Sequence, residues 1–242
     1  MRRRDLLAAA GGLVLGGPAL AQDAPTDGVT TELITYQSRG KTIRAAVFRP
    51  GANANGAGVV YMHGSGGIGG IQLTFARRFA EAGYIAVAPT YVDAAEDDGI
   101  RAERIMDAWR DCGSDAVEWL IAQGVDRGRT GIVGYSLGSY IAVDGALGNS
   151  RAAAAIGVAG GWDVYIPRVP ARRIPVLIIR AERDTHVRPS STERWRQFLV
   201  EHDASVRVQT IRGAPHLMNS AQWAEVSRRS VAFFGNTIAR AS

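Results

Sequence analysis

The chain has 242 residues, of which 46% are hydrophobic and 21% are charged. This composition is typical of a folded globular protein and excludes wholesale disorder, a collagen-like repeat and a coiled coil. The length suits one α/β domain. A single cysteine excludes an intramolecular disulfide and sulfur-based zinc or iron–sulfur sites.

The first 21 residues have the layout of a secretory signal peptide. Three arginines, Arg2–Arg4, precede an apolar run at 6–15, and Ala19-Leu20-Ala21 forms a small-x-small cleavage site. The apolar run is shorter than the roughly 20 residues of a membrane-spanning helix. Paired arginines before apolar residues also resemble the twin-arginine export signal. We therefore expect export to the bacterial periplasm or secretion.

This layout divides the chain into three parts. We expect a signal peptide at 1–21, a flexible leader at 22–30 and one folded domain at 31–242. Removal of the signal peptide takes away three arginines and one aspartate, so the formal charge falls from +5 to +3. A surplus this small does not indicate a nucleic-acid partner. No later apolar run is long enough to span a membrane, so we expect a soluble mature protein.

Strand-like and helix-like segments alternate along the rest of the chain. Alternating β-rich segments on both sides of Arg39-Gly40 predict a hairpin. Later strands read as continuous apolar runs, which predicts burial on both faces. This alternation favours an α/β fold with a mostly parallel central sheet and helices on both faces. We expect strands at 32–38, 42–49, 57–62, 84–88, 131–133, 153–158, 175–179 and 206–211, and helices at 71–82, 101–123 (with a break at 111–114 left open), 137–147, 191–200 and 222–238.

Gly134-Tyr135-Ser136-Leu137-Gly138 has the pattern G-x-S-x-G between a predicted strand and a predicted helix. In that context the serine sits on a sharp strand-to-helix turn, the nucleophile elbow. The N–H of Leu137, at the helix N-terminus, is then placed to stabilise negative charge on a reacting oxygen. A glycine-rich turn in which Ser136 only caps the helix is the alternative.

A serine nucleophile needs a general base. Four histidines are available. His216 follows the last predicted strand, in a loop that opens onto the same sheet edge as Ser136, and is the predicted base. His63 ends a strand and suits a structural hydrogen-bonding role, whereas His186 and His202 lie in polar, exposed stretches.

The base in turn needs an acid that orients it. In folds with this elbow the acid follows the serine and precedes the histidine in chain order. Asp184, just past the predicted strand at 175–179, is the first choice, and Asp163, after the preceding strand, is the reserve. For both, the alternative is an ordinary loop or helix cap.

His63-Gly64-Ser65-Gly66-Gly67 follows the predicted strand at 57–62. A glycine-rich loop there supplies the second oxyanion N–H, from Ser65 or from Gly66. Gly66, Tyr135 and Trp162 are candidate substrate-lining residues. Trp162 is equally compatible with packing against Val164 and Tyr165.

Four short motifs, in this order and spacing, resemble the α/β-hydrolase fold over roughly residues 31–238. They are H-G-S-G-G at 63–67, G-Y-S-L-G at 134–138, E-R-D at 182–184 and A-P-H at 214–216. Within that fold the chain resembles the dienelactone hydrolase-like branch. The resemblance implies a domain without a large cap and hydrolysis of small esters or lactones through an acyl-enzyme, with no cofactor and no metal.

The chain departs from that branch at two positions. The namesake enzymes have a nucleophilic cysteine where this chain has Ser136, and a carboxylate-binding arginine where it has Ser220. Dienelactone itself is therefore not the expected substrate. Four other arginines, in segments expected to shape the site, either bind a carboxylate or are solvated: Arg101, Arg104, Arg172 and Arg173.

Other classes fit less well. Residues 64–69 also match the dinucleotide-binding pattern G-x-G-x-x-G, but two strands precede them and Pro89-Thr90 replaces the acid expected after the next strand. The only lysine, Lys41, lies too far towards the N-terminus for a short-chain dehydrogenase or a Ser–Lys mechanism. No two histidines have the spacing of a helical metal site. A non-catalytic relative that binds a small molecule stays open, and so does the oligomeric state.

Overall fold

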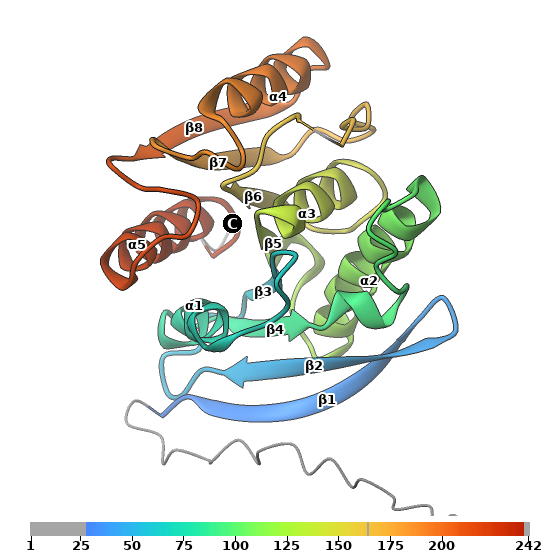
Figure 1. Ribbon diagram of the computed structural model, residues 1–242. Helices are drawn as coiled ribbons and strands as arrows, with labels where there is room; N and C mark the ends of the chain where they lie inside the picture. Colours follow the sequence, from blue (N-terminus) through green and yellow to red (C-terminus); the bar gives the residue numbers. More distant parts are fainter. Residues whose placement is uncertain (1–27, 164, 240–242) are drawn as a thin grey trace, which may run out of the picture.

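The computed structural model describes residues 28–163 and 165–239; the predicted signal peptide and most of the predicted leader lie outside them. One sheet of eight strands forms the centre, in the order β1-β2-β4-β3-β5-β6-β7-β8 (Figure 1). The strands are β1 (Thr30–Ser38), β2 (Lys41–Arg49), β3 (Gly58–Met62), β4 (Ile85–Pro89), β5 (Thr130–Tyr135), β6 (Ala154–Val158), β7 (Pro175–Ala181) and β8 (Ser205–Ile211). The pairs β1·β2 and β2·β4 are antiparallel. The pairs β3·β4, β3·β5, β5·β6, β6·β7 and β7·β8 are parallel. The predicted α/β class and mostly parallel sheet are confirmed.

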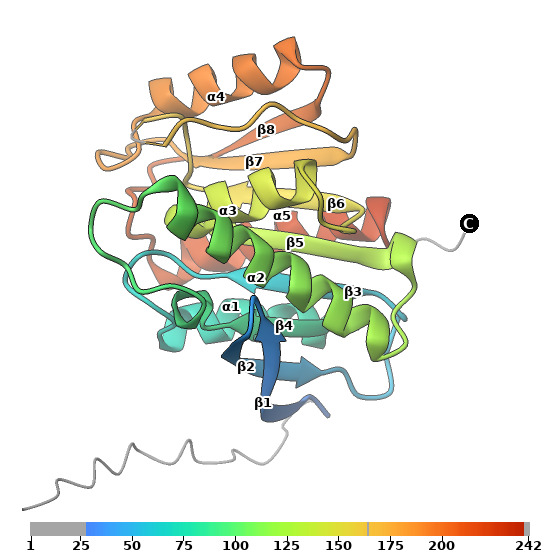
Figure 2. The ribbon, with the colours of Figure 1, turned by 90° about the vertical axis from the view of Figure 1, so that its right-hand side faces the viewer.

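Helices cover both faces of the sheet (Figures 1 and 2). They are α1 (Gly70–Glu81), α2 (Glu103–Ala122), α3 (Leu137–Leu147), α4 (Pro189–Glu201) and α5 (Ser220–Thr237), with short 3₁₀ turns η1 (Tyr91–Asp93) and η2 (Arg127–Arg129). One buried layer includes Trp109 of α2 and Trp195 of α4, and the other includes Phe75 of α1 and Phe234 of α5. No helix of the described residues is both long and apolar enough to cross a membrane.

The predicted hairpin is present, and its two turn residues explain why. Arg39 and Gly40 have φ angles of 48° and 73°. Two consecutive left-handed residues match the right-handed twist of the flanking strands. The register pairs Ser38 with Lys41.

Helix α2 runs unbroken through residues 111–114, so a break there is wrong. Gly113, within that range, faces the sheet. A Cβ at this position would lie 3.2 Å from Met62 Cε and from Ile132 Cδ1. The glycine therefore lets the helix approach β3 and β5 closely, and this close packing offsets its low helix propensity.

Candidate active site

Ser136 connects β5 to α3 in a strained conformation, with φ 52° and ψ −119°. A non-glycine residue with positive φ persists only where its surroundings hold it, and such residues gather at functional sites. The Ser136 N–H donates to the Val158 carbonyl at 2.8 Å, which ties the elbow to β6. The side chain is half-buried.

The two glycines of the motif are required by close contacts. A Cβ on Gly134 would lie 1.9 Å from the Gly138 carbonyl oxygen, and one on Gly138 would lie 2.2 Å from the Met62 carbonyl oxygen. Both distances are far inside van der Waals contact. The spacing G-x-S-x-G thus reflects how tightly the turn packs against itself and against β3.

Gly138→Ala is expected to destabilise the fold by about 3 kcal/mol or more, because the backbone of β3 must shift to admit the methyl group. Gly128→Ala is the matched control, since a Cβ there meets nothing within 4 Å; we expect a change within about 0.5 kcal/mol. Urea unfolding curves of both variants measure the difference. Equal midpoints would contradict the packing argument.

The structure brings Ser136, His216 and Asp184 together. His216 Nε2 lies 2.9 Å from Ser136 Oγ, and His216 Nδ1 lies 2.7 Å from Asp184 Oδ2. Asp184 Oδ1 accepts the backbone N–H groups of His186 and Val187 at 2.9 and 2.8 Å. The carboxylate thus accepts hydrogen bonds on both oxygens, so its orientation towards His216 is fixed.

Tyr135, expected to line the substrate site, is instead almost entirely buried at 6% exposure. Its hydroxyl donates to the carbonyl of His216 at 2.7 Å, and its ring packs on Trp223 of α5 with centroids 4.9 Å apart. The residue beside the serine therefore holds the loop that carries the histidine.

His186 is exposed, as expected from the sequence, but it also contacts the site, which the sequence did not predict. Its ring stacks on the His216 ring, with centroids 4.9 Å apart and planes 23° apart. Its position two residues after Asp184 could have indicated this contact, because the Asp184 carboxylate accepts the His186 N–H. The stack adds contact area that fixes the plane of His216.

The candidate oxyanion donors come from two elements that lie next to Ser136, the start of α3 and the loop after β3. Leu137 is the first residue of α3, where the helix offers its N–H no acceptor. The loop after β3 lies against the elbow, because a Cβ on Gly64 would be 3.4 Å from Ser136 Cβ. Gly67 N–H donates to the Gly64 carbonyl at 3.1 Å, so Ser65 and Gly66 are the exposed central residues of a turn.

His63 is buried beneath this loop. Its Nδ1 lies 2.7 Å from the Gly64 carbonyl oxygen, and its ring stacks on Tyr91 with centroids 4.1 Å apart. Tyr91 also donates its hydroxyl to the His63 carbonyl at 3.0 Å. Burial lowers the pKa of His63, which favours a neutral ring. These contacts agree with a structural role.

Trp162 and Asp163 are engaged elsewhere. Trp162 packs on α4, with its ring centroid 5.3 Å from that of Phe198 and 3.8 Å from the guanidinium carbon of Arg194. Trp162 therefore has packing partners on α4, while Val164, one of the two partners expected from the sequence, lies outside the described residues. The reserve acid Asp163 accepts the Tyr140 hydroxyl at 2.7 Å, whereas the acid on His216 is Asp184.

The four arginines considered for carboxylate binding all have partners in the protein. Arg101 bonds Asp97 at 2.9 Å and the Tyr165 hydroxyl, and Arg104 lies 3.6 Å from Asp98. Arg172 donates to backbone carbonyls that include Ala146 at 3.1 Å, and Arg173 bonds Asp203 at 2.5 Å. These contacts favour structural and surface roles.

The glycine motif at 64–69 is not arranged for a dinucleotide. Helix α1 begins only at Gly70, after the motif, and Gly64 packs against Tyr135 and Ser136. In a dinucleotide-binding loop, the glycine-rich turn leads directly into the helix, so that the phosphates lie at the helix N-terminus. Among the described residues, no group of three His, Cys, Asp or Glu side chains could hold a metal ion.

The sheet order, the elbow and the linked serine, histidine and aspartate define an α/β-hydrolase. The chain belongs to the dienelactone hydrolase family, whose sequence model matches residues 43–234. It is a hydrolase that acts on ester bonds. No curated protein shows significant sequence similarity to it.

Solved structures share the fold at low sequence identity. The dienelactone hydrolase-like promiscuous phosphotriesterase P91 from metagenomic libraries is 16% identical with a TM-score of 0.71, covering 87% of this chain and 99% of its own. An esterase from Pyrobaculum calidifontis is 19% identical with a TM-score of 0.70, covering 87% and 86%. An esterase from Rhizomucor miehei is 16% identical with a TM-score of 0.69, covering 87% and 84%.

Proposed function

We propose that the protein hydrolyses small carboxylic esters or lactones through an acyl-enzyme on Ser136. The observation that carries the proposal is the continuous hydrogen-bond chain from Ser136 through His216 to Asp184 on a strained elbow. A serine hydroxyl becomes a nucleophile when a positioned base removes its proton. Here that base is the Nε2 atom of His216.

In the first half of the reaction, Ser136 Oγ attacks the ester carbonyl while its proton passes to His216. The N–H of Leu137 and that of Ser65 or Gly66 stabilise the oxyanion. Asp184 holds the Nδ1 proton of His216 and stabilises the imidazolium. The C–O bond then breaks, the alcohol leaves with the proton from His216, and the acyl group stays on Ser136.

In the second half, water attacks the acyl carbonyl while His216 accepts one of its protons. The second tetrahedral intermediate collapses, the proton returns to Ser136, and the carboxylic acid is released. Hydrolysis of a lactone follows the same two steps and gives a hydroxy acid. None of these steps requires a group that the chain lacks.

Uncharged esters are the proposed substrate class. Ser220, at the start of α5, stands four residues after His216, where the resemblance places an arginine for a substrate carboxylate. Arg101, just before α2, pairs with Asp97, and Arg104, in the first turn of α2, pairs with Asp98. Both observations argue against a fixed cation for an anionic substrate.

Export is proposed from the sequence alone, since the predicted signal lies outside the described residues. Three arginines followed by an apolar run and Ala19-Leu20-Ala21 support it. We propose a periplasmic or secreted mature chain that begins at Gln22.

A fluorophosphonate probe tests the proposed function directly. We expect one adduct on the peptide that contains Ser136, and hydrolysis of p-nitrophenyl acetate and butyrate that the probe abolishes. The intact mass of the labelled, exported protein should correspond to a chain starting at Gln22. A folded protein that neither takes the label nor hydrolyses an ester, lactone or peptide panel would instead favour the non-catalytic binding alternative.

A further inference from the structure

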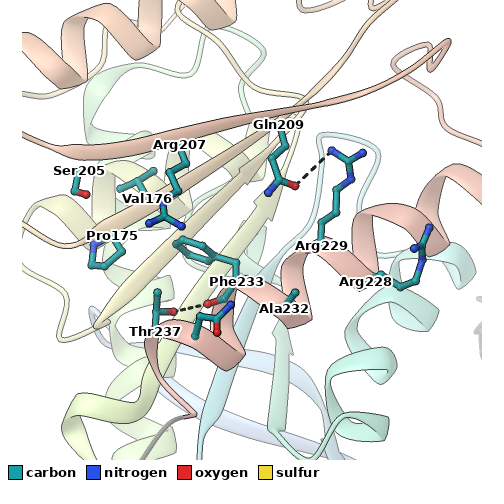
Figure 3. A pocket seen from close by; sticks show the side chains of 11 residues that line it. Pro175, Val176, Ser205, Arg207, Gln209, Arg228, Arg229, Ala232, Phe233 and Thr237 are labelled. Atoms are coloured by element: carbon teal, nitrogen blue, oxygen red, sulfur yellow. Dashed lines mark hydrogen bonds between the residues drawn. The ribbon is translucent and has the colours of Figure 1, made fainter. Parts of the chain in front are cut away.

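A groove lies between helix α5 and strands β7 and β8, and none of the proposed catalytic residues lines it (Figure 3). Its volume is about 470 Å³, within the usual size range of small-molecule sites. Pro175, Ala232 and Phe233 give it an apolar wall. Three guanidinium groups, those of Arg207, Arg228 and Arg229, also line it, and no described lining residue is an aspartate or glutamate.

The sequence of the two elements explains this lining. Strand β8 is an edge strand. Its Val206 and Val208 pack into the layer beneath α4, so Arg207 and Gln209 point to the opposite face, towards α5. On α5, Arg229 and Phe233 are four residues apart and share one side of the helix. Figure 3 shows Arg229 directed towards Gln209, with 3.4 Å between Nη1 and Oε1.

The positive charge here is only partly compensated. Arg229 has an ion-pair partner, Glu225. Arg207 and Arg228 have none among the residues that the structure describes. Elsewhere most described arginines are ion-paired or bonded to carbonyl oxygens, as Arg44 is with Asp93. Like charges that share a groove repel one another, and a bound anion removes that repulsion.

We propose that this groove binds a small organic anion: a carboxylate or phosphate-type group joined to an apolar body. The guanidinium of Arg207, which has no ion-pair partner in the described structure, receives the anionic oxygens, because the planar fork of arginine matches both groups. The apolar body lies on Phe233, Pro175 and Ala232. The site is separate from Ser136 and does not depend on its chemistry.

Isothermal titration with three aromatic probes tests the proposal: phenylphosphonate, benzoate and the uncharged benzyl alcohol, at constant ionic strength. We expect one or both anions to bind and benzyl alcohol not to bind. The tighter of the two anions identifies the anionic group. Failure of both anions to bind would overturn the proposal.

Arg207→Gln is expected to weaken anion binding by about tenfold or more, through loss of a charge-assisted bidentate contact. Arg207→Lys keeps the positive charge but not the planar guanidinium, so its affinity for the anion should lie between those of wild type and Arg207→Gln. The matched control is Arg127→Gln on η2, because Arg127 also lacks an ion-pair partner in the described part of the chain. Equal affinity in wild type, Arg127→Gln and Arg207→Gln would place the anion elsewhere and overturn the proposal.

Discussion

Ser136→Ala is expected to lower kcat for p-nitrophenyl butyrate by on the order of 100,000-fold. The hydroxyl is the proposed nucleophile, and no other hydroxyl shares its hydrogen bond to His216 Nε2 in the described structure. Alanine keeps the Cβ, so the strained backbone at φ 52° is no more crowded than before. We expect the free energy of unfolding to change by only about 1 kcal/mol, for the lost hydrogen bond.

Ser65→Ala is the matched control for this experiment. Ser65 is an exposed serine on the loop that faces the elbow, and alanine there keeps the backbone N–H that is one of the two candidate oxyanion donors. We expect kcat within roughly threefold of wild type, because a backbone donor is retained. If Ser65→Ala abolished turnover while Ser136→Ala retained it, the proposed nucleophile would be wrong.

Asp184→Asn is expected to give the second large loss of kcat. Asparagine can still accept the two backbone N–H groups of His186 and Val187 through its Oδ1 atom. Its amide group would then face His216 Nδ1 and force the ring into the wrong tautomer. We therefore expect kcat to fall about 10,000-fold while the fold is preserved.

Asp163→Asn separates the two candidate acids. The carboxylate of Asp163 accepts the hydroxyl of Tyr140, and an asparagine carbonyl accepts the same hydrogen bond. We expect kcat to stay within roughly threefold of wild type, since neutral hydrogen bonds contribute little net free energy. Steady-state kinetics with p-nitrophenyl butyrate compare the two variants. If Asp163→Asn were inactive while Asp184→Asn stayed active, the assignment of Asp184 as the acid would be wrong.

The sequence was informative where chain position alone decides geometry. Ser136, Asp184 and His216 each follow a strand of one parallel sheet, and the ends of parallel strands meet at one edge. Their proximity could therefore be predicted without knowing any loop conformation. The same argument placed the loop 63–67 beside Ser136, because β3 and β5 are neighbours.

Contacts made by side chains across loops could not be predicted in this way. The hydrogen bond from Tyr135 to the His216 carbonyl and the stacking of His186 on His216 depend on how two loops fold against each other. The contact of Trp162 with Phe198 was not foreseen, because it depends on α4 beginning close to the end of β6. Hydrophobic patterning predicts which residues are buried, but it does not predict which residues they pack against.

Arginines posed the same difficulty for a different reason. Arg172 and Arg173 are neighbours in sequence, yet Arg172 bonds backbone carbonyls and Arg173 pairs with an exposed aspartate. A long side chain reaches several acceptors, and only the fold selects one. The net charge of +5 therefore does not show that Arg207 lacks an ion-pair partner in the described structure.

The hydroxyl of Tyr135 has a consequence for how this protein can diversify. Through it, the chain segment that carries Ser136 is bonded directly to the segment that carries His216. The separation of Ser136 and His216 is therefore set by a buried contact that involves neither of the surface loops at 94–102 and 165–173. Changes in the length or composition of those loops would therefore leave the spacing of Ser136 and His216 unchanged.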